Sequence, residues 1–179
     1  MKKLLIVFFT LSLMQNISYS QSGKPYRILG NWLGDWKGSV IMSYPGGNSQ
    51  TIPIELKISE TDSSRVWKWE IISGTGESKE VISYILSEID FQSGLFMLEK
   101  DSSAQIDFYC FDFNTFYNTY SENGVLITSQ YKLQNNKIYL EINTFDMNSA
   151  KNIPQNGSYS GLIYSYPLKV IRKSELSKE

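Results

Sequence analysis

The chain has 179 residues, of which 17 are basic and 18 acidic, and a net charge of −1, so nucleic acid is not an expected partner. It contains no histidine, which removes the commonest metal ligand and general base, and its single cysteine excludes an intramolecular disulfide. We therefore expect one domain that is held together by packing and needs no metal or cofactor.

The first twenty residues have the features of a secretory signal peptide. Met1-Lys2-Lys3 is a basic start, and the apolar run from Leu4 to Met14 is too short to span a bilayer with ease. Ser18-Tyr19-Ser20 supplies small residues at the spacing that signal peptidase requires. We therefore expect cleavage before Gln21, export to the periplasm or the extracellular space, and a mature domain of residues 21–179 without an integral membrane segment. An uncleaved anchor helix is the alternative.

The stretch from Leu29 to Gly38, LGNWLGDWKG, contains two glycine-x-tryptophan steps just before the first alternating segment. We expect Arg27 to Leu33 to form one short helical turn at the end of a barrel. Gly34 permits a tight turn, and Trp36 brings a ring large enough to seal that end if its indole N–H finds a buried acceptor.

Alternation of apolar and polar side chains predicts strands through most of the remaining chain. Ile52 to Ile58 has the clearest alternation, and Val66 to Ser73 places Trp67 and Trp69 on one face. Asn123-Gly124 is the strongest hairpin signal, because both central residues of a type I′ turn need a positive φ. The ten predicted strands cover residues 36–44, 52–58, 66–73, 81–87, 95–100, 105–111, 114–121, 125–133, 137–145 and 166–173.

Two segments lack this alternation. Asp146 to Gly161 is rich in Asn, Ser and Gly and predicts an excursion loop, and the charged tail from Ser174 to Glu179 is predicted to fray.

Because the other connections are short, neighbouring strands should be antiparallel, and closing the sheet removes its edges. We therefore predict an all-β fold: an antiparallel up-and-down β-barrel of eight to ten strands with a short N-terminal helical turn.

Both ends of the predicted domain resemble the lipocalin-like, or calycin, superfamily of small barrels. Gly34-Asp35-Trp36 resembles its glycine-x-tryptophan signature, for which Gly30-Asn31-Trp32 is the alternative. Arg172 resembles the basic residue that, in these barrels, packs on the tryptophan and bonds to backbone carbonyls. The GDWKG opening and the ending from Pro167 to Lys173 are also similar to uncharacterised secreted lipocalin-like proteins of bacteria. The resemblance implies that the glycine, the tryptophan and Arg172 close the barrel.

Our first functional hypothesis is a non-enzymatic barrel that binds a small apolar or amphipathic molecule. Aromatic residues at alternate strand positions would form apolar walls, and phenolic hydroxyls would orient the ligand. The alternative for the same side chains is ordinary core packing. The residues expected to contact a ligand are Trp67, Trp69, Tyr84, Phe108, Tyr117 and Tyr131.

Two other classes of function are left open. A protein-interaction or inhibitor module would have a solid core and use its loops, especially Asp146 to Gly161. A hydrolase or isomerase would depend on carboxylates, because no histidine is present. The carboxylate pairs that could serve a glycosidase are Asp107 with Asp112 and Glu70 with Glu141, although alternation predicts that they face outward.

Two further interpretations are disfavoured by the strand pattern. Cys110 shares a predicted face with Ile106 and Phe108, which favours a buried, unreactive thiol over a nucleophile. An outer-membrane barrel requires a continuous apolar exterior, and charged residues such as Lys57 and Lys132 interrupt it.

Overall fold

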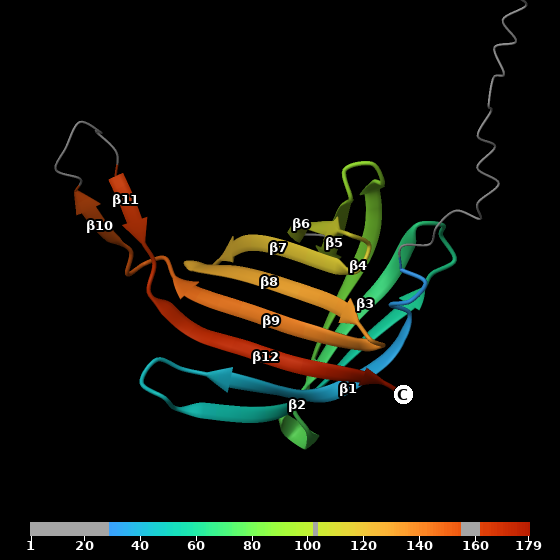
Figure 1. Ribbon diagram of the computed structural model, residues 1–179, viewed down its shortest axis with the longest axis horizontal. Coiled ribbons are helices and arrows are strands. Elements are labelled where there is room, and N and C mark those ends of the chain that lie inside the picture. Colours follow the sequence, from blue (N-terminus) through green and yellow to red (C-terminus); the bar gives the residue numbers. More distant parts are fainter. Residues whose placement is uncertain (1–28, 102–103, 155–161) are drawn as a thin grey trace, which may run out of the picture.

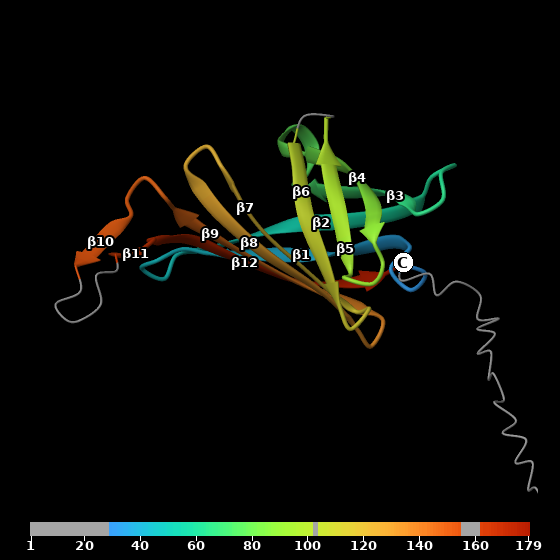
Figure 2. The same cartoon turned by 90° about the horizontal axis from the view of Figure 1, so that it is seen from above.

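The computed structural model describes residues 29–101, 104–154 and 162–179. In this part of the chain ten strands form one closed barrel, and every neighbouring pair is antiparallel (Figures 1 and 2). The predicted fold class is thereby confirmed. The predicted signal peptide and Arg27 lie outside the described residues. The barrel strands are β1 (Gly34–Ser43), β2 (Ser49–Glu60), β3 (Val66–Ser73), β4 (Glu80–Asp90), β5 (Leu95–Lys100), β6 (Ala104–Phe111), β7 (Thr115–Glu122), β8 (Val125–Gln134), β9 (Lys137–Asp146) and β12 (Leu168–Lys178).

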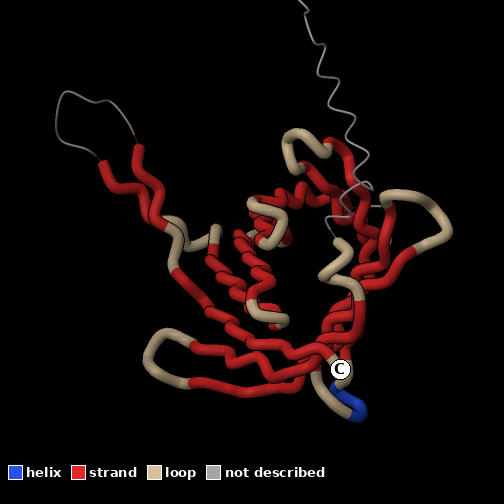
Figure 3. The backbone as a smooth tube through the Cα atoms, turned by 45° about the vertical axis from the view of Figure 1, so that its right-hand side comes forward, coloured by secondary structure: helices blue, strands red, loops and turns tan. Residues whose placement is uncertain are grey.

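The strands run in chain order around the barrel, and β12 closes it by pairing with both β9 and β1. We call the end where β1 begins and β12 ends the base, and the opposite end the mouth. The β1–β2, β3–β4 and β7–β8 turns lie at the mouth, while the C-terminus lies at the base (Figure 1). The only helix in the described residues is the single 3₁₀ turn η1 (Gly76–Ser78), which belongs to the β3–β4 connection (Figure 3).

The base is closed by the segment that precedes β1. The carbonyl of Leu29 accepts hydrogen bonds from the backbone N–H groups of Trp32 at 2.9 Å and Leu33 at 3.1 Å, which makes one short turn. Trp36 is fully buried, and its indole Nε1 donates to the Trp32 carbonyl at 2.7 Å. The predicted tryptophan seal and its buried acceptor are therefore confirmed.

The basic residue beside this tryptophan differs from the one that the resemblance implied. Lys178 places its Nζ 5.2 Å from the centre of the Trp36 ring. Arg172 pairs instead with Met42, six residues further along β1, and its side chain lies near the mouth. The expectation that Arg172 packs on Trp36 was wrong, because β12 extends beyond the segment that alternation marks as a strand.

Gly34 lets Lys178 approach the start of β1 closely. Its φ of +125° lies in a region that side-chain-bearing residues rarely adopt. A Cβ at this position would stand 2.6 Å from Cε of Lys178. Gly34 is the first residue of β1, directly after the short turn of residues 29–33, and its positive φ is one that glycine adopts readily.

The C-terminal segment is the last part of β12 and not a frayed tail. Ser174 pairs with Val40 of β1 and with Leu140 of β9, and its hydroxyl donates to the carbonyl of Ser39 at 2.9 Å. Leu176 is fully buried. Barrel closure explains the difference, since a strand that pairs on both sides tolerates charged residues at its outward positions.

The segment predicted to be an excursion loop, Asp146 to Gly161, contains the first strand of a separate hairpin, whose second strand follows directly after it. Strands β10 (Lys151–Pro154) and β11 (Leu162–Ser165) pair with each other and extend away from the barrel (Figures 1 and 3). The expectation of a segment without strands was therefore wrong. Four-residue strands are too short for their alternation to stand out in the sequence. The rest of the predicted loop, residues 155–161, lies outside the described residues.

The hairpin turns follow their sequence signals. Asn123 and Gly124 have φ values of 49° and 76°, as the predicted type I′ turn requires. Asn135 and Asn136 have φ values of 53° and 56° and join β8 to β9 in the same way. These two turns set the register of the three strands β7, β8 and β9.

Candidate functional site

The lower half of the barrel, next to the base, is a solid aromatic cluster around Trp69. This indole is fully buried, and its ring meets the rings of Phe108 and Tyr131 nearly edge-on, with centres 5.5 Å and 5.2 Å away. Edge-to-face contacts of this kind add to the stabilisation that burial itself provides. The other members of the cluster are Trp32, Trp67, Phe96 and Phe116. This cluster forms a floor across the barrel.

Above the floor, the upper half of the barrel encloses a cavity of about 380 Å³. The volume falls at the lower end of the range found for small-molecule sites, roughly 300–1,000 Å³. Most of its wall is apolar, and the side chains come from strands on all sides of the barrel. Its apolar residues include Val40, Ile52, Ile71, Ile82, Ile127 and Ile142, and its polar residues include Tyr84, Asn118, Tyr120, Ser129, Tyr131 and Arg172.

The polar side chains deep in the cavity are largely satisfied by one another. The hydroxyl of Ser129 donates to Oδ1 of Asn118 at 2.6 Å, and both residues are buried. The indole N–H of Trp69 makes no hydrogen bond of good geometry within the described residues. It nevertheless lies close enough to the Tyr131 hydroxyl to favour the phenolate form of that tyrosine. The floor is therefore apolar with a few internal donors.

The cavity tyrosines are neutral at physiological pH. Burial, with smaller effects from Tyr120, Glu122 and Glu80, raises the pKa of Tyr84 to about 12. Burial also raises the pKa of Tyr120 and that of Tyr131, which is completely enclosed. Each hydroxyl can therefore donate a hydrogen bond to a ligand as well as accept one.

Arg172 brings a permanent positive charge into the cavity near its mouth. The side chain is half-buried, and its Nη1 donates to Oγ1 of Thr144 at 2.8 Å. Among the described residues, Arg65 forms an ion pair with Glu88, whereas no carboxylate lies within 4.0 Å of the Arg172 guanidinium. Its charge favours ionisation of Tyr120, which places that hydroxyl close by.

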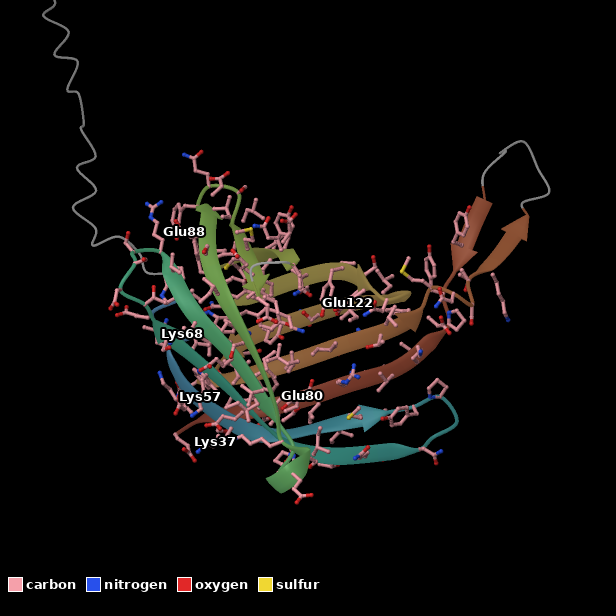
Figure 4. All side chains as sticks on the ribbon, turned by 180° about the vertical axis from the view of Figure 1, so that it is seen from behind. Lys37, Lys57, Lys68, Glu80, Glu88 and Glu122 are labelled. Carbon is pink, nitrogen blue, oxygen red and sulfur yellow. The ribbon has the colours of Figure 1, made fainter. Side chains whose placement is uncertain are left out.

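Two carboxylates stand at the rim of the mouth. Glu80 is the first residue of β4 and lines the cavity, while Glu122 is the last residue of β7 (Figure 4). Both side chains are exposed to solvent. Among the residues that line the described cavity, Arg172 is therefore the cation and Glu80 the carboxylate.

The residues predicted to bind a ligand separate into three groups. Trp69, Tyr84 and Tyr131 line the cavity. Trp67 and Phe108 are buried in the aromatic floor and are not among the residues that line the cavity. The remaining residue, Tyr117, lies on the outer face of the barrel, as described below.

Tyr117 lies outside the barrel, so its expected contact with a ligand in the interior is corrected. Its neighbours in β7, Phe116 and Asn118, are buried, and alternation turns Tyr117 the opposite way. With Tyr109 and Phe111 it borders an outer hollow of about 650 Å³. β6 and β7 are paired only from Tyr109 opposite Tyr117 to Phe111 opposite Thr115, so the wall is weakly connected here.

Several cavity residues were missed by sequence reasoning. Arg172 was assigned to the base because of its resemblance to a closing residue. Its alternation with Ser174 and Leu176 puts it on the inward face of β12, and that was a usable signal. Asn118 and Ser129 carried no such signal, because short polar residues at alternate positions are common on either face of a strand.

Comparison with known proteins supports the fold. No protein-family model and no curated protein matches this chain. One solved structure with the same architecture is a protein of unknown function from the DUF3598 family of Nostoc punctiforme PCC 73102. Its TM-score is 0.58 and its identity 12%, and the match covers 84% of this chain and 49% of that one. This chain thus spans about half the length of the DUF3598 protein.

A second solved structure matches over nearly its whole length. It is an S-type phycobiliprotein lyase from Guillardia theta, with a TM-score of 0.58 and 7% identity. The match covers 83% of this chain and 89% of the lyase. Both likenesses agree with the closed antiparallel barrel of this chain. At such identities the likeness extends to the fold alone.

Three of the four carboxylates weighed as catalytic pairs, Glu70, Glu141 and Asp107, lie on the outer face of the barrel, while Asp112 belongs to the turn between β6 and β7. Glu70 accepts a hydrogen bond from the Ser83 hydroxyl at 3.1 Å, and Glu141 forms an ion pair with Lys173 at 3.0 Å. Asp107 borders the outer hollow beside Tyr117. None of the three is among the residues that line the described cavity.

Cys110 is half-buried and packs against the core of the barrel. Burial, together with the nearby charge of Asp112, raises the pKa of its thiol to about 11. The thiol is therefore protonated near neutral pH, and protonated thiols are weak nucleophiles. This agrees with the unreactive role expected from the sequence.

The described residues contain neither a metal-ligand cluster nor a membrane-spanning helix. Histidine, cysteine, aspartate and glutamate side chains do not gather there in groups of three or more that could hold a metal ion. Among the described residues, no helix is long and apolar enough to cross a membrane.

Proposed function

We propose that this protein is an exported member of the calycin superfamily that binds a small apolar or amphipathic molecule inside its barrel. The observation that carries the proposal is the cavity of about 380 Å³ above the Trp69 floor. Apolar surface that a ligand covers here contributes roughly 25 cal/mol per Å². A barrel filled only for packing would extend its aromatic core to the mouth.

The polar groups of the cavity favour an amphipathic ligand over a pure hydrocarbon. Neutral hydroxyls of Tyr84 and Tyr120 and the guanidinium of Arg172 share the space with isoleucine side chains. A ligand with one polar end can satisfy these donors while its apolar part covers the walls. A hydrocarbon would displace their water and leave them unpaired.

The likeness to a phycobiliprotein lyase supports this proposal at the level of architecture, since the two chains share a barrel of similar extent. The non-catalytic part of the proposal rests on placement. The carboxylates considered for catalysis lie on outer faces, where Glu70 and Glu141 are engaged with Ser83 and Lys173. The export part rests on the signal-like first twenty residues.

The neutral dye N-phenyl-1-naphthylamine tests binding without bias from charge. We expect its fluorescence to rise on titration into the protein. Ile82→Trp, which fills the cavity from β4, should weaken dye binding by about 10-fold or more because it removes buried volume. Ile85→Trp is the matched control, since Ile85 is 39% exposed on the other face of the same strand.

Dye binding that is absent, or that both variants retain equally, would contradict the proposal. Native mass spectrometry of protein purified from its own host supplies the second readout, in which a bound apolar molecule is expected. Secretion is tested separately, since N-terminal sequencing of the mature protein should begin at Gln21.

The protein-interaction alternative is favoured by a different observation, the exposed aromatic side chains Tyr109, Phe111 and Tyr117 beside the outer hollow. The cavity weighs against the solid core that this alternative assumes. A barrel that binds no dye but loses a partner when Phe111 is replaced by Ser would favour it.

A further inference from the structure

We propose that Arg172 anchors the negatively charged head of a single-charged amphiphile at the mouth, with the apolar tail of the ligand extending down to the Trp69 floor. This inference rests on the proposed ligand-binding function and specifies the class of ligand. The resemblance to the calycin superfamily implied a purely structural role for Arg172.

The first argument is the state of the guanidinium. Arg172 is half-buried, spends one N–H on the neutral hydroxyl of Thr144, and has no carboxylate within 4.0 Å among the described residues. Arginine carries five N–H donors in a rigid fork that matches the oxygens of an anion. Charged groups removed from water are normally paired. The remaining N–H groups are therefore available to an anionic ligand.

The second argument is the position of this charge in the cavity. Arg172 pairs with Met42, the residue before the last of β1, so it lies near the mouth. Below it, isoleucine side chains line the way to the floor, where Trp69 and Tyr131 close the cavity. A head at the guanidinium would keep contact with water while the tail is buried. The order of polar and apolar surface thus sets the orientation of the ligand.

The third argument concerns the neighbouring hydroxyls. Tyr120 lines the same cavity as the guanidinium, and burial raises the pKa of its hydroxyl, so the hydroxyl is protonated at neutral pH. Tyr84 is likewise neutral, with a pKa of about 12. Neutral phenols can donate to an anionic oxygen, whereas phenolates would repel it. The guanidinium and these hydroxyls together form a set of donors that suits an anion.

The rim carboxylates limit the charge of the ligand. Glu80 and Glu122 are exposed, so water and salt screen their repulsion of a bound head. The half-buried guanidinium is screened less. A head with one negative charge gains from Arg172, the one cation among the residues that line the described cavity, while each further negative charge would face Glu80 without a second cation in that lining. The mouth therefore selects a monoanion.

Three molecules built on a straight ten-carbon chain test this inference: decanoate, decan-1-ol and decyltrimethylammonium. We expect decanoate to displace N-phenyl-1-naphthylamine at a concentration at least about 10-fold lower than decan-1-ol does, since a charge-assisted hydrogen bond contributes about that factor. Equal displacement by decanoate and decan-1-ol, or stronger displacement by the ammonium compound, would overturn the inference. Failure of the dye itself to bind would instead refute the proposed function.

Variants of β12 identify the residue responsible. Arg172→Gln should reduce the preference for decanoate over decan-1-ol by about 10-fold or more, while Arg172→Lys should retain part of that preference. Lys173→Gln is the matched control, because it removes the same charge from the outer face one residue away. Far-ultraviolet circular dichroism and urea unfolding establish that each variant is folded. A preference for decanoate that survives Arg172→Gln would refute the assignment.

Discussion

Replacing Trp36 by Phe should destabilise the barrel by about 2–4 kcal/mol, because it breaks the contact that seals the base. The indole N–H donates to the carbonyl of Trp32 at 2.7 Å in buried surroundings. A phenyl ring leaves that carbonyl without its donor, which costs about 1–3 kcal/mol. The smaller ring also opens a void, and an unfilled volume of about 40 Å³ costs about 1 kcal/mol.

The measurement is the free energy of unfolding of the chain from Gln21 onward. Unfolding in urea is monitored by far-ultraviolet circular dichroism, and the free energy is extrapolated to zero denaturant. Ile41→Val is the control, since Ile41 lies on the outer face of the same strand with half of its surface exposed. This control should change the free energy of unfolding by less than about 0.5 kcal/mol. A loss below about 1 kcal/mol for Trp36→Phe, with an unchanged denaturant slope, would refute the inference that this contact closes the base.

Three further outcomes follow from the structure. Gly94→Ala should cost more stability than Gly46→Ala in the same urea assay, because both glycines have positive φ but only a Cβ at Gly94 would stand 2.4 Å from a backbone atom, the carbonyl oxygen of Cys110. Deleting residues 174–179 should abolish cooperative unfolding, since these residues complete β12; a truncated chain that still unfolds cooperatively would contradict the closed barrel. Stability should fall as the pH rises from about 9 to 12, because burial raises the pKa of Cys110 from 9.0 to about 11 and that of Tyr84 from 10.0 to about 12. The folded state then favours the protonated forms of both groups. A free energy of unfolding that does not change with pH across this range, measured by chemical denaturation, would show that neither group is buried.

Local pattern was sufficient to predict the strands of the barrel. Asn123-Gly124 specified a type I′ turn, and alternation from Ile52 to Ile58 specified a strand with one buried face. Both signals depend on residues adjacent in the sequence, through backbone sterics or the two-residue period of a strand. The indole of Trp36 could likewise be predicted to need a buried acceptor, because its N–H is lost to water on burial.

The two short strands of the β10–β11 hairpin and the last part of β12 escaped this reasoning. The segment from Ser174 to Lys178 reads as a charged tail, and its pairing with both β1 and β9 is what orders it. Likewise, only the fold reveals that Tyr117 faces outward while Trp69 forms the floor of a cavity. Alternation defines two faces of each strand but cannot say which of them turns inward when both carry aromatic residues.

The sequence by itself determined the all-β class, the antiparallel connections and the need for a sealed end, since each follows from residues that are neighbours in the chain. The tertiary structure alone decided that Lys178 and not Arg172 lies over Trp36, and that Arg172 enters the cavity. The reason is geometric. The depth of a residue in a barrel depends on how far each strand is displaced along its neighbours, and this displacement results from closure of the whole sheet.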